Sequence, residues 1–152
     1  MMLKVGDVAP NFETQTSEGE NISLSQFEGK KVVLYFYPKD NTPGCIAEAC
    51  SIRDNYQTFQ AQGIPVFGVS GGTVNSHEKF RAKFDLPFPL LMDENFELAK
   101  KYNAWKPGNK VKRITYLIDE EGKIEGIFGG SDSEKVETKE HAQQIISFWK
   151  LA

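Results

Sequence analysis

Two cysteines stand five positions apart, Cys45 and Cys50, and they are the only thiols in the chain. Thr42 and Pro43 precede them, a pair typical of a helix N-cap followed by the first helical position. Cys45 then takes the third position of the predicted helix, where backbone N–H groups lack intrahelical partners and the helix dipole is positive. Both effects favour the thiolate, the reactive form of cysteine. A free cysteine is also commonly a small buried core residue, so at this point reactivity and packing both stay open for Cys45.

The position of Cys50 limits how the two thiols can react with each other. In an intact helix five residues correspond to a turn of roughly 140° and a rise of about 7.5 Å, which separates the two Cα atoms by about 8.6 Å. A disulfide needs Cα atoms within about 7 Å of each other. Either Cys50 is a bystander, or the start of the helix unwinds so that the sulfurs meet. The second case suits a peroxide reaction, in which Cys45 becomes a sulfenic acid and condenses with Cys50 to a disulfide.

The elements that must position this segment alternate between strands and helices. Apolar, β-rich runs predict strands at residues 31–37, 64–70, 114–119 and 124–128, the last two joined by a turn at Glu121-Gly122. Helical periodicity predicts helices at about residues 43–61, 74–84, 94–102 and 136–150. This order predicts an α/β fold with a central mixed β-sheet flanked by helices. Short extended pieces around Phe12 and residues 22–24 are expected at the sheet edge.

Length and composition favour a soluble globular protein. The chain has 152 residues, of which 39% are hydrophobic and 26% charged, so we expect a single domain over residues 1–152. No apolar run approaches the length of about 18 residues that spans a membrane, and no secretory signal pattern opens the chain. We therefore expect a cytoplasmic protein that does not engage a membrane. The net charge of -3 at pH 7 offers no basic field for nucleic acid.

Metal binding is not expected. His77 and His141 lie far in sequence from the cysteines and from each other, so the paired local spacing of a zinc site is missing. His77 is assigned to a helix start, near the cap. The acidic pair Asp93-Glu94 and the run at 119–121 are interpreted as solvated turns.

The residues around Cys45 match a known signature. Pro38, Thr42 and Cys45 fit the pattern Pro-x-x-x-Thr-x-x-Cys of peroxiredoxins, and with Glu48 and Cys50 the segment resembles the bacterioferritin comigratory protein branch, also called the PrxQ type. The resemblance continues along nearly the whole chain, in VGDVAPNF, GVSGG, SHEKF, LPFPLLMDE, KYNAW, RITYLIDEEGKI and EHAQQII.

This resemblance implies a thioredoxin-like fold with a short N-terminal extension, and a thiol peroxidase acting on hydrogen peroxide and organic hydroperoxides. Cys45 is the implied peroxidatic cysteine and Cys50 the implied resolving cysteine, joined in an intramolecular disulfide. Thioredoxin or a similar dithiol protein is the implied electron donor, with no metal or organic cofactor. We expect a monomer.

The resemblance also implies roles for four further residues. Thr42 donates a hydrogen bond to the bound peroxide and Pro38 shields the pocket from water, while Arg113 matches the active-site arginine of the family. Glu48 orients an arginine or tunes the pocket. Donors of this kind stabilise the negative charge that develops on the leaving oxygen. Thr42 is expected to cap the helix as well, and Gly44 to let a small substrate approach the backbone.

Two other functions compete with the peroxidase. A dithiol–disulfide exchange protein on the same fold is disfavoured because such sites use Cys-x-x-Cys, in which both sulfurs can bridge. A non-enzymatic binding module with inert thiols is the third possibility. Tyr102 and Trp105 are expected to pack near the pocket rim, and Gly71-Gly72 to form a flexible loop.

Overall fold

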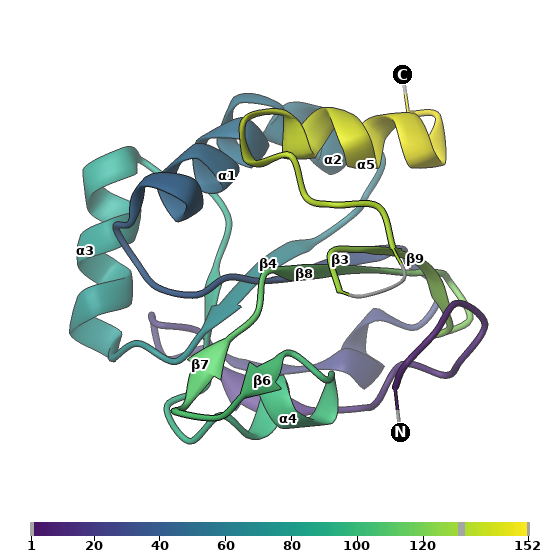
Figure 1. The fold of residues 1–152 in the computed structure, drawn as a ribbon. Helices are drawn as coiled ribbons and strands as arrows, with labels where there is room; N and C mark the ends of the chain where they lie inside the picture. The colour runs from purple at the N-terminus through teal and green to yellow at the C-terminus, as the bar shows by residue number, and fades with distance from the viewer. Residues whose placement is uncertain (1, 131–132, 152) are drawn as a thin grey trace.

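A five-stranded mixed sheet lies at the centre of the computed structural model, which describes residues 2–130 and 133–151 (Figure 1). The strands, in their spatial order, are β5 (Leu90–Met92), β4 (Val66–Ser70), β3 (Val32–Phe36), β8 (Ile114–Ile118) and β9 (Ile124–Phe128). β4 runs parallel to β3 and β5, whereas β8 runs antiparallel to β3 and β9. The predicted central mixed sheet is confirmed, although β5 was not predicted because it is only three residues long.

Strand β3 separates two hydrophobic cores. Every one of its residues is buried, as the continuous apolar run predicts for a strand covered on both faces. Alternate side chains point to opposite faces: Val32, Leu34 and Phe36 join one core, and Val33, Tyr35 and the following Tyr37 join the other. Cys45 belongs to the second of these cores, so the chemistry is confined to one face of the sheet.

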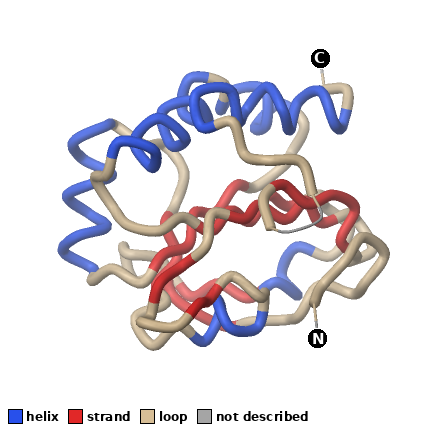
Figure 2. Tube along the Cα trace, viewed as in Figure 1, coloured by secondary structure: helices blue, strands red, loops and turns tan. Residues whose placement is uncertain are grey.

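That face is covered by helices α1 (Pro43–Asp54), α2 (Tyr56–Ala61) and α5 (His141–Trp149), with the 3-10 turn η2 (Thr138–Glu140) before α5 (Figures 1 and 2). The single helix predicted over 43–61 is wrong, because it breaks at Asn55. The Asn55 side-chain amide donates to the carbonyl of Ser51 at 2.9 Å, so the side chain competes for a helix carbonyl at the break. The apolar stripe nevertheless continues across the break to Phe59.

The remaining elements surround the sheet. Helix α3 (Val74–Phe84) lies at one side of the molecule and α4 (Glu97–Lys101) on the face opposite α1, beside the hairpin β6 (Trp105–Lys106) and β7 (Lys110–Val111) (Figure 1). Helix α4 begins later than predicted, since Phe96 before it has a left-handed backbone with φ 60°. The opening segment forms the hairpin β1 (Glu13–Gln15) and β2 (Asn21–Ser23), followed by η1 (Leu24–Phe27). A bridge from Thr16 to Leu91 joins this extension to edge strand β5, as predicted.

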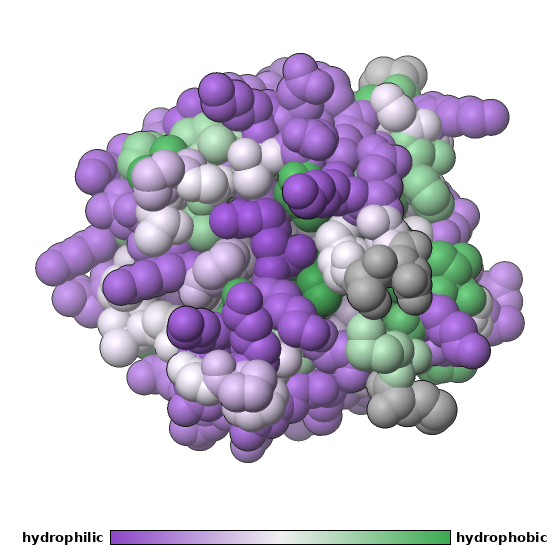
Figure 3. All heavy atoms as spheres, in the orientation of Figure 1, coloured by the Kyte–Doolittle hydropathy of each residue, from purple (hydrophilic) through white to green (hydrophobic). Residues whose placement is uncertain are grey.

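Hydrophilic side chains dominate the face of the molecule seen in Figure 3, and apolar side chains reach it in smaller groups. Across residues 2–130 and 133–151, every helix is too short or too polar to cross a membrane.

Candidate active site

Helix α1 begins where the sequence predicts, at Pro43, with Thr42 as the extended N-cap residue and Cys45 in the first turn. The first helical hydrogen bond runs from the Ile46 N–H to the Thr42 carbonyl at 2.8 Å. The expectation that the Thr42 side chain caps the helix is wrong. Its hydroxyl donates instead to the carbonyl of Lys39, in the loop that precedes the helix, at 2.9 Å.

The Cys45 side chain is 1% exposed and lies against the guanidinium of Arg113. Arg113 Nη2 donates to Cys45 Sγ at 3.4 Å. Gly44 makes this approach possible, since a Cβ at that position would stand only 2.9 Å from Nη2. The group that uses the space beside Gly44 in this structure is therefore the arginine. A fixed positive charge beside the sulfur favours the thiolate over the thiol.

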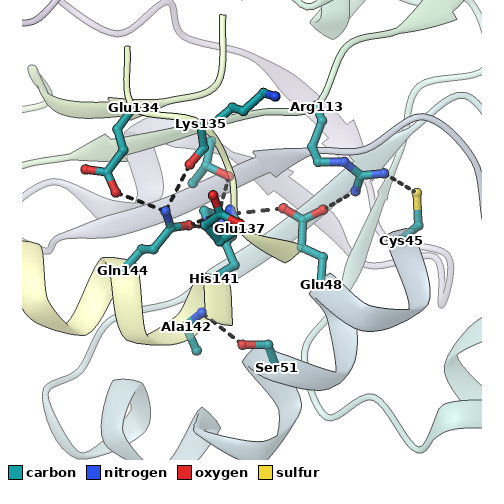
Figure 4. Close-up of polar contacts among 11 residues, drawn as sticks. Cys45, Glu48, Ser51, Arg113, Glu134, Lys135, Glu137, His141, Ala142 and Gln144 are labelled. Atoms are coloured by element: carbon teal, nitrogen blue, oxygen red, sulfur yellow. Dashed lines mark hydrogen bonds and ion pairs between the residues drawn. The ribbon is translucent and has the colours of Figure 1, made fainter. Parts of the chain in front are cut away.

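Glu48 lies one turn further along α1 and is fully buried. Its Oε1 accepts from Arg113 Nη1 at 2.6 Å, so one guanidinium contacts both Glu48 and Cys45 (Figure 4). Burial raises the pKa of Glu48 to about 7, although the charge of Arg113 opposes this rise. Burial also disfavours the charged form of Arg113, but its interactions with Glu48 and Cys45 outweigh that effect and raise its pKa.

His141, at the start of α5, reaches the same cluster from the opposite side. Its Nε2 lies 2.7 Å from Thr115 Oγ1 and 3.6 Å from Glu48 Oε2. Burial lowers the pKa of His141 to about 4. Sequence reasoning gave this residue no role, and no local signal could have done so, because its partners come from α1 and β8, which are distant in sequence.

Cys50 lies on the same unbroken helix as Cys45 and is partly exposed, and both thiols are free. The next residue, Ser51, ties α1 to α5: its Oγ accepts from the Ala142 N–H at 3.0 Å (Figure 4). The intact helix keeps the two cysteine Cα atoms at the separation of about 8.6 Å expected from helix geometry. A disulfide between them requires this part of α1 to open.

The loop before α1 is anchored through Asp40, which is also buried. Asp40 accepts from Tyr37 Oη at 2.6 Å and from Ser76 Oγ at 2.7 Å, and its Oδ2 lies 2.6 Å from His77 Nδ1. Burial alone would raise the pKa of Asp40, but the hydrogen bonds from His77 and Tyr37 lower it. The cap of α3 is Thr73, not His77, which was expected at the cap but serves as the buried partner of Asp40.

Gly71 and Gly72, where the sequence predicts a flexible loop, lie close to other side chains. A Cβ at Gly71 would overlap the ring of Phe96, and one at Gly72 would lie 2.9 Å from Asp40 Oδ2. The small size of the two glycines allows this close packing, against Phe96 at Gly71 and against the loop anchor Asp40 at Gly72.

Three other expectations concern side chains around the sheet. Pro38 is exposed, directly after Tyr37 at the end of β3. Tyr102 and Trp105 do pack, but with the core on the face of the sheet opposite Cys45. Asp93 is not a solvated turn residue, because it is buried and caps α4 by accepting from two backbone N–H groups. In the part of the chain that the structure describes, no cluster of three or more His, Cys, Asp or Glu could hold a metal ion.

Comparison with known proteins gives consistent results. The sequence model of the AhpC/TSA family matches residues 5–127. Peroxiredoxin Bcp of Bacillus subtilis (strain 168) is 37% identical and covers 99% of this chain and 97% of its own. Peroxiredoxin Bcp of Escherichia coli (strain K12) is 35% identical and covers 97% and 96%. The structure of a cysteine-to-serine mutant of PrxQ from Xylella fastidiosa is 29% identical, with a TM-score of 0.87 over 99% of this chain and 97% of that chain.

Proposed function

The chain belongs to the AhpC/TSA family and is a peroxiredoxin of the Bcp/PrxQ type, a thiol-dependent peroxidase; from this premise we propose how its residues carry the reaction. Cys45 is the peroxidatic residue. Its thiolate attacks one peroxide oxygen, an S–O bond forms and the O–O bond breaks, and the second oxygen leaves as water or an alcohol after taking a proton. The sulfur is left as a sulfenic acid. The observation that supports this assignment is Arg113 Nη2 at 3.4 Å from Cys45 Sγ, in the first turn of α1.

Arg113 also stabilises the oxygen that leaves. Negative charge develops on that atom as the O–O bond breaks, and preorganised donors lower the barrier most when they already point at it. Glu48 holds the guanidinium from the other side by a hydrogen bond of 2.6 Å, so Arg113 need not reorganise during the reaction. Thr42 contributes its hydroxyl to the peroxide by turning away from the Lys39 carbonyl that it now contacts. Pro38, which is exposed in the loop after β3, limits access of water.

Cys50 is the resolving residue. Once Cys45 is a sulfenic acid, the Cys50 sulfur attacks the Cys45 sulfur, an S–S bond forms and the hydroxyl leaves as water. Because both residues lie on one helix, α1 opens between them during this step. Thioredoxin or a similar dithiol protein then reduces the disulfide by exchange and restores both thiols. The substrates are hydrogen peroxide and organic hydroperoxides, and the enzyme acts as a monomer.

Stopped-flow measurement of peroxide reduction, with one equivalent of peroxide and no added reductant, tests these roles. Reduced wild type should consume the peroxide and end as an intramolecular disulfide. Cys45→Ser should not react. Cys50→Ser should react once and retain a sulfenic acid that a sulfenic-acid probe can trap. A Cys45→Ser protein that consumes peroxide at the wild-type rate would remove the assigned nucleophile, and an intramolecular bridge in Cys50→Ser would remove the assigned resolving thiol.

The electron donor and the oligomeric state have separate tests. In steady-state assays, thioredoxin with its reductase should sustain turnover, whereas glutathione alone should not. Sedimentation of the reduced enzyme should give the mass of one 17.1 kDa chain. If the protein reduced the disulfides of insulin without turning over peroxide, it would be an exchange protein instead.

A further inference from the structure

Glu48 and His141 face each other in a closed part of the core. Both side chains are completely buried, and Glu48 Oε2 lies 3.6 Å from His141 Nε2. Glu48 Oε1 already accepts from Arg113, but Oε2 accepts no hydrogen bond from any residue that the structure describes. A buried carboxylate oxygen without a donor is costly, so the protonation state of this pair needs an explanation.

Gln144 determines which nitrogen of His141 carries a proton. Its side-chain amide nitrogen donates to the Lys135 carbonyl at 2.9 Å and to Glu134 Oε2 at 3.1 Å (Figure 4). Its Oε1 is therefore the acceptor, and it accepts from the Glu137 N–H at 3.0 Å. The same Oε1 lies 2.8 Å from His141 Nδ1, which must then be the protonated nitrogen of the ring.

His141 Nε2 consequently presents a lone pair when the ring is neutral. Thr115 Oγ1 lies 2.7 Å from this nitrogen, and Glu48 Oε2 faces it at 3.6 Å. An ionised Glu48 would place a second lone pair opposite the first, with no proton between them. We infer that His141 and Glu48 together hold one buried proton, and that this proton leaves the charge of Arg113 free to stabilise the Cys45 thiolate.

The charge balance around Arg113 gives this proton its effect. One guanidinium contacts Glu48 at 2.6 Å and Cys45 Sγ at 3.4 Å. If Glu48 is ionised, two anions share a single cation and the thiolate is disfavoured. If the pair keeps its proton, the thiolate is the only anion that contacts the Arg113 guanidinium among the residues that the structure describes. Burial supports this state, since it raises the pKa of Glu48 to about 7 and lowers that of His141 to about 4, which places the proton on Glu48.

The other groups that face the pair stay neutral or reach solvent. Tyr35, on β3, is fully buried. Its burial is the main cause that raises the pKa of its hydroxyl well above the usual value, and the nearby Glu48 and Cys45 add to this effect. In η2 and at its N-cap, the charged residues Glu137, Lys139 and Glu140 are exposed, so water screens them. The titration within this part of the core is therefore that of the pair itself.

This inference rests on the proposed role of Cys45 and makes His141 a positioning residue, because it acts through Glu48 and Arg113 and does not touch the peroxide. It predicts that ionisation of Cys45 is spread over two steps. While the pair is protonated the thiolate forms readily, and when the pair loses its proton near pH 7 the thiolate becomes less favoured. The ultraviolet absorbance of the thiolate, followed against pH in a Cys50→Ser background, reports this directly.

Two substitutions in that background test the pair. Glu48→Gln imitates the protonated carboxyl, so the titration should collapse to a single step at lower pH. His141→Gln puts an amide where Nε2 was, and its N–H favours an ionised Glu48. The thiolate titration should then move up by about one pH unit, and the peroxide rate at pH 7 should fall about tenfold. Adding Glu48→Gln to His141→Gln should restore the rate, which a purely structural defect would not allow. Glu140→Gln, beside His141 but exposed, is the matched control and should titrate as the parent does.

Nitrogen NMR of the imidazole in the unsubstituted enzyme gives a second readout, which does not depend on the buried variants folding. His141 should carry its proton on Nδ1 between about pH 5 and about pH 8, and its signals should shift near pH 7 as Glu48 ionises. Any one of three results would overturn the inference. The first is a ring proton on His141 Nε2 alone, and the second is a parent titration identical to that of Glu48→Gln. The third is a defect in His141→Gln that Glu48→Gln fails to rescue. The absorbance and NMR measurements do not use peroxide, so they test the shared proton separately from the proposed function. A parent protein that titrates in two steps but does not consume peroxide would contradict the proposed function, whereas the inference of a shared proton would stand.

Discussion

One added methyl group at Gly44 tests whether the position of Arg113 controls the reactivity of Cys45. A Cβ there would lie 2.9 Å from Arg113 Nη2, whereas ordinary contacts begin at 3.4 Å, so the guanidinium must retreat by about 0.5 Å. Position 44 lies within α1, where alanine favours the helix over glycine by up to about 1 kcal/mol. Gly44→Ala should therefore keep or raise the stability of the protein while it damages the site.

The size of the damage follows from the hydrogen bond that is disturbed. Arg113 Nη2 donates to Cys45 Sγ at 3.4 Å, and hydrogen bonds that involve charged groups contribute about 1.5–3 kcal/mol. Since about 1.4 kcal/mol in a barrier corresponds to a tenfold change in rate, Gly44→Ala should slow the first reaction with peroxide by roughly ten- to a hundredfold.

The assay is stopped-flow reduction of hydrogen peroxide at pH 7, with thermal unfolding measured on the same samples. Arg113→Met supplies the control background, because the methyl group at position 44 has no guanidinium to displace there, and Gly44→Ala should then cause no further loss. A Gly44→Ala protein that unfolds at or above the wild-type temperature and still reacts at the wild-type rate would refute the reasoning. An equal loss of rate in both backgrounds would refute it as well, since the effect would not pass through Arg113.

Three further predictions concern the helix and its anchors. Ser51→Ala leaves the buried Ala142 N–H without its acceptor and should lower the free energy of unfolding in urea by about 1–3 kcal/mol, whereas Ser51→Thr, which keeps a hydroxyl, should lose less. Oxidation to the disulfide should reduce hydrogen-exchange protection over residues 43–55, and unchanged protection would contradict the opening of α1. Burial raises the pKa of Asp40, but the hydrogen bond from His77 helps to lower it below the unfolded-state value of 3.8. The ionised form of Asp40 therefore contributes stability above pH 3.8, and this contribution is lost as the pH falls through the lower folded-state pKa. Asp40→Asn should therefore flatten the acid limb of melting temperature against pH, and an acid limb as steep as that of wild type would contradict this anchor.

The start of α1 could be predicted from sequence because its signals are local. Thr42 and Pro43 determine where the helix begins, and three residues of helix geometry then place Cys45. The break at Asn55 could not be predicted in the same way. The apolar stripe runs through it without interruption, and the break depends on a side chain that competes for a backbone carbonyl.

The rest of the site depends on the sheet. Arg113 reaches Cys45 because β8 pairs with β3, the strand that leads into the loop before α1. Glu48 and His141 are brought together by the packing of α5 on α1, far apart in the chain. Periodicity predicts that each of these elements exists, but not which side chains meet across them. The family resemblance supplied the arginine, and nothing in the chain pattern alone pointed to His141.

Helix α1 has to satisfy two opposed requirements in the proposed cycle, since its first turn must stay folded to stabilise a thiolate and then open to let Cys50 reach Cys45. The structure separates these requirements along the chain. Before the helix, buried Asp40 fixes the loop to α3 through Ser76, and after Cys50, the buried hydrogen bond of Ser51 fixes α1 to α5. Opening between the two anchors has to break the contacts of Arg113 with Cys45 and Glu48, whereas the Cys50 side chain there is already partly exposed. Because both ends of the segment stay in place, the second sulfur is kept near the first while the turns between them unwind, and the effective concentration of the resolving thiol stays high.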